Sequence, residues 1–512
     1  METPTILPVI NPVKTLVKAE EIRKIGFKAV ITNAYIIKKN LDKFKRLEVH
    51  QILGFDGPVM TDSGAYQQLL YGKVDAQPEE MIKFQETLST DIAVILDVPT
   101  GMTKNKVEAL KTVEETLERA KKGVDIRDST KQILWVGPIQ GGVNLDLVSY
   151  ASKELSRLDY HIHALGSPVQ LMERYEYDIL VDMIVAAKTN MPSSRPLHLF
   201  GAGHPSMLAL AVALGCDLFD SASYALFARD GRYLTAHWTY RVENLKELPC
   251  NCPVCSKTTI EDLKEMPHEE LERLLSIHNL YVLAEEIKAI KQSIVEGRLW
   301  EHLESRCRAH PKLFKALKTL KKYEKYLERG DPITKGKGRG IFIYDQNSLI
   351  RPEVTRHKER VVRYKPLLFK KVVMLPEPST KPFHKDGIIR KLLKKMVQQD
   401  IHVCFYSPTF GVIPMELDET FPLSQFESTC EYQEATEHIA EVFERYLTNI
   451  LPASPEILIV SVKEDTASAA QRIFNICTRY NARTKIFCCK KYDEVLSRIG
   501  ESFGTSSSNG GP

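Results

Sequence analysis

The chain has 512 residues, of which 43% are apolar and 27% are charged. This composition is typical of a globular protein with two to four domains and unlike that of a disordered chain. No apolar stretch approaches the roughly 20 residues that cross a bilayer, and the start METPTILPVINP lacks the charged-then-apolar layout of a signal peptide. These observations argue against a membrane protein and predict a cytoplasmic location.

The net charge of +4 is unevenly distributed along the chain. Residues 308–400 hold 25 Lys and Arg side chains against 9 Asp and Glu, a net charge of about +16, so the remaining residues sum to about −12. Solvated helix faces would explain any one of these lysines. A block this biased nevertheless favours a polyanionic partner such as nucleic acid.

The first 224 residues alternate short β-branched or apolar runs with longer amphipathic stretches such as VEALKTVEETLERAKKGV. This alternation is typical of repeated strand–helix units and a parallel sheet. Eight runs predict strands, at residues 5–10, 28–36, 57–64, 91–98, 133–140, 160–167, 197–203 and 216–223. Eight units favour an α/β fold with a (β/α)8 TIM barrel over residues 1–244, and a doubly wound sheet is the alternative.

Three further regions follow the predicted barrel. Residues 245–335 contain a cysteine cluster and a Lys/Glu-rich helical stretch at 262–329, which predict an inserted zinc-binding subdomain and closing helices. After the Gly/Lys linker GDPITKGKGRG, residues 341–503 predict a smaller α/β (α+β) region with strands at VVML, IHVCFYS, EILIVSV and TKIFCC. Residues 504–512, GTSSSNGGP, predict a disordered tail.

Polar and glycine residues stand at the ends of several predicted barrel strands. The active sites of such barrels lie at the carboxyl ends of the strands, so these positions are candidates for chemistry. They are Asp62, Asp97, Gln140, Gly166 and Asp220. A single carboxylate there is often only a helix cap, but three carboxylates on different strands at the same end favour a functional site.

Three carboxylates at one barrel mouth could exchange a nucleobase. One can displace the base from the anomeric carbon of ribose and form a covalent ester, which a second base then attacks. Another, with a pKa nearer neutrality, can protonate the leaving base and later deprotonate the incoming one. A third can read guanine, because a carboxylate accepts from both the ring N–H and the exocyclic amine of that base.

A base that enters such a pocket must leave its stack, and flat side chains compensate for the lost stacking. Tyr66 lies near Asp62 in DSGAYQ, and Phe200 ends the seventh predicted strand. Both are candidates for the stacking pair, and both could instead be ordinary core aromatics.

The cysteines Cys250, Cys252 and Cys255 form a Cys-x-Cys-x-x-Cys cluster, and His278 follows in a helical pattern. Three thiolates and one imidazole would make a closed tetrahedral structural zinc site. The alternative is a set of buried free cysteines beside an unrelated histidine. His268 is also within range as the fourth ligand.

The ordered motifs MTDSGAYQ, LDVPTG, IQGG, HLFGAGHP, DLFDSASYAL and CNCPVC…H resemble those of the archaeal tRNA-guanine transglycosylases over residues 3 to about 363. The resemblance implies that Asp220 is the nucleophile, that Asp62 is the general acid/base and that Asp97 reads the base. It also implies base contacts from Gln140 and Gly166 and a stacking pair formed by Tyr66 and Phe200. The cluster Cys250, Cys252, Cys255 and His278 maps onto the zinc site of that family.

The resemblance also implies a substrate and partners. The archaeal family exchanges guanine-15 in the D-arm of tRNA for 7-cyano-7-deazaguanine (preQ0), the first tRNA step towards archaeosine, and its enzymes tend to be homodimers. HLFGAGHP and FDSASYAL look like the archaeal versions of these motifs. We find no segment that resembles the RNA-binding PUA-type domain of the archaeal enzymes, and we expect a separate PUA protein to supply that grip on tRNA.

The later region PEPSTKPFHKDGIIRKLLKK is similar to a domain shared with archaeosine synthase. That relative carries a cysteine near its Lys-Pro-Tyr motif, whereas this chain has Lys381, Pro382 and Phe383 with Glu377 at the cysteine position. We therefore expect a tRNA-positioning module. The alternatives are a non-catalytic RNA-binding subunit, a synthase, and a zinc hydrolase; the last is disfavoured because the metal ligands lie in one late insertion.

Overall fold

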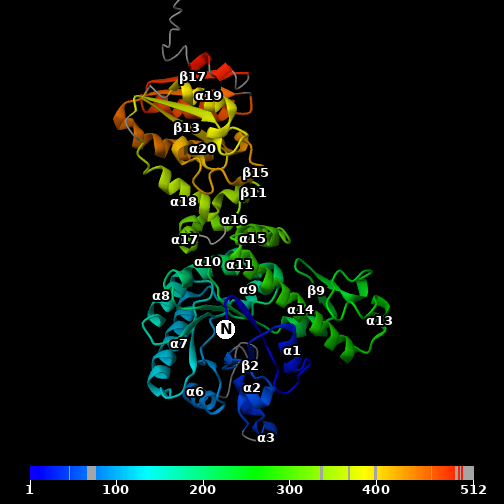
Figure 1. Ribbon diagram of the computed structural model, residues 1–512. Helices are drawn as coiled ribbons and strands as arrows, with labels where there is room; N and C mark the ends of the chain where they lie inside the picture. The colour runs from blue at the N-terminus through cyan, green and yellow to red at the C-terminus, as the bar shows by residue number, and fades with distance from the viewer. Residues whose placement is uncertain are drawn as a thin grey trace, which may run out of the picture. The chain divides into compact units, whose positions relative to one another are not determined.

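The structure is a computed structural model that forms two compact units, Met1–Leu320 and Lys321–Pro512 (Figure 1). It describes residues 1–44, 47–65, 77–334, 338–366, 369–396, 400–462, 464–490, 494–495 and 497–499. Tyr66 and the tail expected at 504–512 lie outside these residues. None of the helices in the described ranges combines the length and apolar character that crossing a bilayer requires.

Eight parallel strands form the sheet of the first unit, in the order β1-β8-β7-β6-β5-β4-β3-β2. The strands are β1 (Thr5–Pro8), β2 (Val30–Asn33), β3 (Val59–Asp62), β4 (Ile92–Val94), β5 (Leu134–Ile139), β6 (Ile162–Leu165), β7 (Leu197–Leu199) and β8 (Leu218–Ser221). The first strand pairs in parallel with the last, and a bridge between Val9 and Ile31 joins β1 to β2. The predicted (β/α)8 barrel is confirmed, since a doubly wound sheet would not pair its first strand with its last.

The strands are short and apolar because the barrel buries both of their faces. All four residues of β2 and all four of β6 are buried. Leu7, Met60, Val136 and Leu218 belong to one buried cluster that several strands build together. This packing fills the barrel and leaves the carboxyl ends of the strands free for polar residues.

Helices connect the strands and cover the barrel (Figure 1). In α7, the side chain of Asn105 accepts from the backbone N–H groups of the first turn, and the apolar residues fall on one face of the helix. The helices of this part are α1 (Ala19–Ile25), α2 (Ala34–Lys39), α3 (Leu41–Phe44), α4 (Val49–Leu53), α6 (Pro78–Thr87), α7 (Lys106–Ile126), α8 (Leu145–Leu155), α9 (Val169–Glu173), α10 (Tyr177–Lys188), α11 (Pro205–Ala213) and α12 (Ser223–Arg229).

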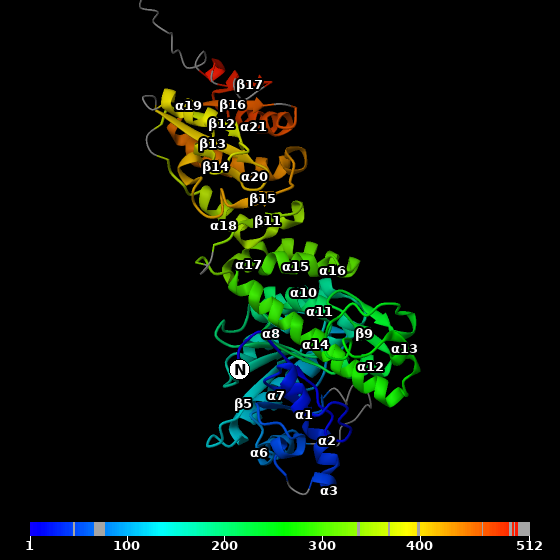
Figure 2. The same ribbon diagram turned by 45° about the vertical axis from the view of Figure 1, so that its right-hand side comes forward.

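A hairpin and four helices follow the barrel within the first unit. They are β9 (Arg232–Leu234), β10 (Thr239–Arg241), α13 (Ile260–Glu265), α14 (His268–Val295), α15 (Leu299–Cys307) and α16 (Pro311–Thr319). The long helix α14 packs against α11 and α12, and α15 packs against α11 (Figure 2). The hairpin and the added helices therefore pack against the last helices of the barrel.

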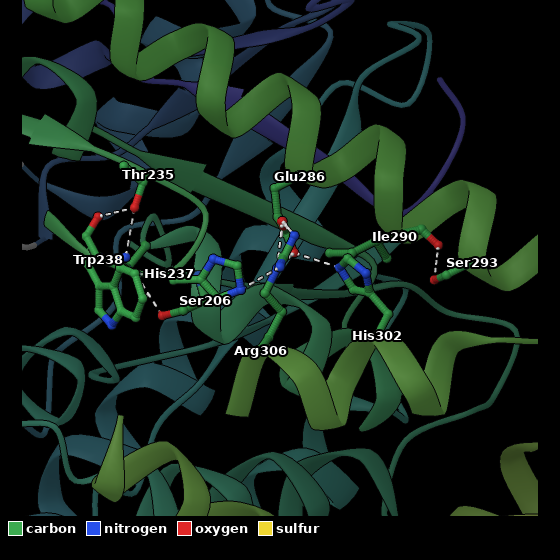
Figure 3. Close-up of polar contacts among 10 residues, drawn as sticks. Ser206, Thr235, His237, Trp238, Glu286, Ile290, Ser293, His302 and Arg306 are labelled. Atoms are coloured by element: carbon green, nitrogen blue, oxygen red, sulfur yellow. Dashed lines mark hydrogen bonds and ion pairs between the residues drawn. The ribbon is translucent and has the colours of Figure 1, made fainter. Parts of the chain in front are cut away.

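A buried ion pair fastens α14 to α15 (Figure 3). Both carboxylate oxygens of Glu286 accept from the guanidinium of Arg306 at 2.8–3.0 Å, and His302 Nε2 lies 2.8 Å from Glu286 Oε1. Burial acts to raise the pKa of Glu286, but the hydrogen bonds from His302 and Arg306 outweigh it and leave that pKa below its usual value. Arg306 Nη1 also lies 3.0 Å from His237 Nε2, which ties in the loop of the hairpin.

The second unit contains a five-stranded sheet in the order β14-β13-β12-β16-β17. The strands are β12 (Lys371–Pro376), β13 (Ile401–Ser407), β14 (Gly411–Pro414), β16 (Glu456–Val462) and β17 (Thr484–Cys489), and β11 (Ile341–Ile343) pairs separately with β15 (Phe426–Ser428). All pairs of the larger sheet are parallel except β13 with β14. The four longer strands match the sequence prediction, which missed β11, β14 and β15.

Helices cover both faces of this sheet. One buried cluster joins α20 and α21 to Val372 and Met374, and another joins α19 to Val373 and Leu375, as the alternation of side chains along β12 requires. The helices of the second unit are α17 (Glu324–Gly330), α18 (Pro352–Val361), α19 (Gly387–Met396), α20 (Tyr432–Ile450) and α21 (Ala467–Arg479).

The ion pair between α14 and α15 gives a test of the first unit. Glu286→Ala leaves the largely buried Arg306 guanidinium without its carboxylate, so we expect the free energy of unfolding to fall by about 3–5 kcal/mol. Glu285→Ala, at an exposed position of the same helix, is the matched control and should change it little. Chemical denaturation followed by circular dichroism measures both. Equal stability of the two variants would contradict the structural role of the pair.

Candidate active site and metal centre

The carboxyl ends of the barrel strands surround a cavity of about 730 Å³. Six of the predicted site residues line it: Asp62, Asp97, Gln140, Gly166, Phe200 and Asp220. The seventh, Tyr66, lies outside the described residues. The barrel geometry thus brings together strand-end residues that are up to 158 positions apart in the chain.

Asp62 is the last residue of β3 and accepts a hydrogen bond from Asn33 Nδ2 at 3.0 Å. Its pKa is raised to about 7. Burial is the main cause, and the negative charges of Asp97 and Asp220 add to it, while backbone N–H groups act in the opposite direction. A carboxyl group with this pKa can both give and take a proton near neutral pH.

Asp97 follows β4 and is 5% exposed. Burial raises its pKa to about 6, although the hydrogen bond from Gln140 works against this. Gln140 Nε2 donates to Asp97 Oδ2 at 2.5 Å, and Gln140 Oε1 accepts from Thr100 N and Ser167 Oγ at 3.0 Å each. Gln140 therefore fixes the orientation of the Asp97 carboxylate.

Gly166 directly follows β6, and its role is steric. A Cβ atom at this position would lie 2.3 Å from Gln140 Nε2 and 2.6 Å from Gln140 Cδ, so any side chain here would displace the Gln140 amide from its present position. The backbone φ at Gly166 does not require glycine, because it lies outside the left-handed region. Glycine is needed here because Gln140 occupies the space beside it.

Asp220 lies within β8, and its side chain is 14% exposed. Its Oδ1 atom lies 2.9 Å from His198 Nε2 and accepts from the Gly201 backbone N–H at 2.9 Å. Both contacts fall on the same oxygen, so they hold the carboxylate in one orientation. Sequence reasoning missed His198, which is fully buried in the middle of β7.

Phe200 directly follows β7 and is partly buried on the cavity wall. Its ring centroid lies 4.7 Å from that of His198, with an interplanar angle of 54°. The ring borders the space that a planar ligand would enter. Asn33, the last residue of β2, also lines the cavity and was missed, although the strand-end rule would have found it.

The three carboxylates differ in their surroundings although they share one cavity. Asp62 carries a pKa near neutrality, Asp97 is held by an amide, and Asp220 is held by an imidazole and a backbone N–H. Such separation of environments is what distinguishes proton transfer, recognition and nucleophilic attack among residues of the same type.

Cys250, Cys252, Cys255 and His278 come together in a single cluster, and their candidate ligand atoms all lie within 4.8 Å of one another. Cys252 Sγ lies 3.6 Å from Cys255 Sγ, and the two thiols lie 3.5 and 3.4 Å from His278 Nδ1. The edges of a tetrahedron around an ion with bonds of about 2.0–2.3 Å have similar lengths. The cluster could therefore hold a metal ion.

The histidine of the cluster is prepared for a metal. His278 Nε2 lies 2.9 Å from the Leu234 carbonyl oxygen, which can only accept, so Nε2 carries a proton and Nδ1 is the nitrogen that would bind a metal ion in the neutral ring. His268, the alternative ligand, is exposed and contacts the Arg229 carbonyl oxygen instead. The four cluster residues lie outside the lining of the large cavity, as expected of a structural rather than a catalytic metal.

Residues 1–312 match the family described as queuine tRNA-ribosyltransferase. Residues 354–497 match a domain of unknown function. The first match covers the barrel, the metal cluster and every predicted site residue.

Known relatives agree with this match. A tRNA-guanine(15) transglycosylase of Sulfolobus acidocaldarius is 44% identical over 429 residues, which are 83% of this chain and 84% of that protein. The enzyme of the same name from Pyrobaculum aerophilum is 42% identical over 449 residues, 87% of this chain and 89% of that protein. The one from Methanocaldococcus jannaschii is 43% identical over 439 residues, 83% of this chain and 65% of that protein. The chain belongs to the queuine tRNA-ribosyltransferase family of tRNA-guanine transglycosylases, which are pentosyltransferases.

Proposed function

We propose that the chain exchanges guanine-15 in the D-arm of tRNA for preQ0 through a covalent intermediate on Asp220. The observation that carries this proposal is the meeting of Asp62, Asp97 and Asp220 at one barrel mouth in three different environments. The names of the relatives support guanine-15 as the target. The choice of preQ0 rests on the resemblance of HLFGAGHP and FDSASYAL to the archaeal enzymes.

In the first step, Asp220 attacks the anomeric carbon of the ribose while the bond to guanine breaks. The contacts from His198 and Gly201 fall on Oδ1, which leaves Oδ2 to form the new bond. Asp62 in its protonated form gives its proton to the departing guanine, and this neutralises the leaving group. Asp97, oriented by Gln140, accepts from N1–H and the exocyclic amine of guanine.

In the second step, the incoming base takes the place of guanine and attacks the same carbon from the same side. Asp62, now ionised, removes the proton that the incoming base loses, and the ester to Asp220 breaks. Both steps invert the anomeric carbon, so the exchange retains its configuration overall. Phe200 borders the base, and Tyr66 is the second stacking residue that the family resemblance implies.

We assign the Cys250, Cys252, Cys255 and His278 cluster to one structural zinc ion per chain. Three sulfur ligands and one imidazole nitrogen suit zinc better than hard cations such as magnesium or calcium. The ion would join the cysteine loop to α14, which also carries the buried Glu286. It would stabilise this part of the first unit without taking part in the exchange.

We infer that the second unit positions tRNA and has no synthase chemistry. Lys381 donates to the Phe426 carbonyl oxygen at 2.9 Å, and its Nζ lies 3.6 Å from Glu377 Oε1. Burial raises the pKa of Glu377 and lowers that of Lys381. Lys381 therefore links Phe426 of β15 to Glu377, the residue that directly follows β12. Glu377 stands at the position where archaeosine synthase has its cysteine. The formation of a homodimer and the binding of tRNA with the help of a separate PUA protein stay predictions.

Replacing the nucleophile tests the proposal directly. In Asp220→Asn, the side chain cannot form the ester, so exchange of labelled guanine into tRNA should fall by more than about 10³-fold. A tRNA–protein adduct that survives denaturing electrophoresis should form with the unaltered chain and vanish in the variant. Asp125→Asn, at an exposed position on α7, is the control and should keep both signals. An adduct that persists in Asp220→Asn would contradict the proposal.

The raised pKa values predict a narrow pH optimum. Asp97 must be ionised to read guanine, so kcat/KM for tRNA should fall as pH drops below about 6. Asp62 must be protonated to assist guanine departure, so kcat/KM should also fall as pH rises above about 7. Initial rates measured from about pH 5 to about pH 9 at fixed ionic strength give both limbs of the profile. A rate that stays level up to the alkaline end of this range would show that Asp62 is not the acid.

The zinc assignment predicts the metal content of the purified chain. We expect one zinc ion per chain by elemental analysis, and loss of this ion with a lower melting temperature in Cys252→Ser, because three ligands hold zinc less tightly than four. Cys488→Ser, at an exposed cysteine outside the cluster, should keep the metal. A full complement of zinc in Cys252→Ser would contradict the assignment.

A further inference from the structure

A second recess lies within the unit Lys321–Pro512, at the side chains of α17, α18 and the turn after α18. Its volume is about 340 Å³. The lining residues are Lys325, Glu328, Arg329, Arg356, Glu359, Arg360 and Arg363. Five cationic side chains face two carboxylates here, which leaves a formal charge of +3. We call this feature the arginine recess.

The two carboxylates of the arginine recess are already engaged. Glu328 Oε1 accepts from Arg356 Nε at 2.8 Å. Glu359 Oε1 accepts from Arg445 Nη2 at 3.2 Å and lies 4.0 Å from Lys325 Nζ. Arg356 also reaches the carbonyl and carboxylate of Asp331, so it fastens α17 to α18 and has a structural role.

Three arginines of the recess have no such partner. Arg329, Arg360 and Arg363 are exposed, and within the described parts of the chain their side chains make no hydrogen bond or ion pair. The Arg363 backbone N–H donates to the Arg360 carbonyl at 3.0 Å, and this turn keeps the two side chains on the same recess. The recess therefore keeps a net positive charge after its own two carboxylates are counted, which favours an anionic ligand.

We propose that the arginine recess binds phosphate groups of the tRNA backbone, an inference that rests on the proposed function. A guanidinium presents a planar fork of N–H donors that matches two phosphate oxygens, and three such forks in one recess can hold successive phosphates. Such contacts carry no sequence information, so the recess would strengthen binding equally for different tRNAs. Free phosphate has the same oxygen chemistry and is the alternative source of a ligand for the recess.

The test compares two pairs of substitutions that remove the same charge from the second unit. Arg360→Gln/Arg363→Gln alters the recess. Arg472→Gln/Arg479→Gln alters α21, where the two arginines pair with Glu437 and Glu444. Fluorescence anisotropy with an unmodified tRNA transcript gives the dissociation constant over a range of potassium chloride concentrations. Circular dichroism melting confirms that each variant is folded.

We expect the recess variant to bind tRNA roughly tenfold more weakly at near-physiological salt, with a salt slope about 0.9 units shallower for each phosphate that it no longer neutralises. The control should change neither quantity by more than about twofold. In guanine exchange, KM for tRNA should rise in the recess variant while kcat stays the same. Millimolar inorganic phosphate at constant ionic strength should leave tRNA affinity unchanged. A single phosphate ion cannot contact all three arginines at once, whereas successive phosphates of the tRNA backbone can.

The inference would be overturned if the recess variant kept the tRNA affinity and salt slope of the unaltered chain, or if the control pair lost as much affinity as the recess variant. A recess variant that binds tRNA normally but no longer binds inorganic phosphate in calorimetric titration would also overturn it and identify a free phosphate site. Guanine exchange by the unaltered chain reports separately on the proposed function. If the unaltered chain exchanges guanine but the recess variant binds tRNA normally, only the recess inference fails. If the recess variant loses tRNA binding but the unaltered chain does not exchange guanine, only the proposed function fails.

Discussion

The site depends on the burial of three acidic side chains at one end of a closed barrel. Parallel strands all deliver their carboxyl ends to the same rim, so Asp62, Asp97 and Asp220 must share a poorly hydrated space. Ionising all three there is costly, because burial disfavours the charged form of a carboxyl group. Burial and the charges of Asp97 and Asp220 raise the pKa of Asp62 to about 7, whereas burial raises that of Asp97 to about 6 against the opposing hydrogen bond from Gln140.

The support for these carboxylates comes from side chains on neighbouring strands of the barrel. Gln140, which directly follows β5, donates to Asp97 through its amide nitrogen. Its amide oxygen accepts from Thr100 and Ser167, which fix the orientation of the amide. His198 comes from β7, the strand next to that of Asp220. The barrel thus fixes each support relative to its carboxylate, which is the preorganisation that the proposed two-step substitution at one carbon requires.

The barrel and most of the cavity could be predicted because their signals are local. Each strand is a short apolar run, and the strand-end rule selects Asp62, Asp97 and Asp220 without knowledge of the contacts. His198 could not be found this way, since it sits in mid-strand between two leucines and its role depends on a partner 22 residues away. The strands β11 and β15 have three residues each, as β4 and β7 do, but the barrel strands also belong to a repeating strand–helix pattern, which β11, β14 and β15 lack.

The close approach of Gln140 to Gly166 has a consequence for how relatives of this chain can diverge. A methyl group at position 166 needs the space that the amide fills, and a shorter residue at position 140 releases both that space and its hold on Asp97. The two positions are therefore coupled, and their substitutions should be non-additive. Over evolutionary time we expect them to change together or not at all, which makes this pair a marker of how the barrel mouth holds the Asp97 carboxylate.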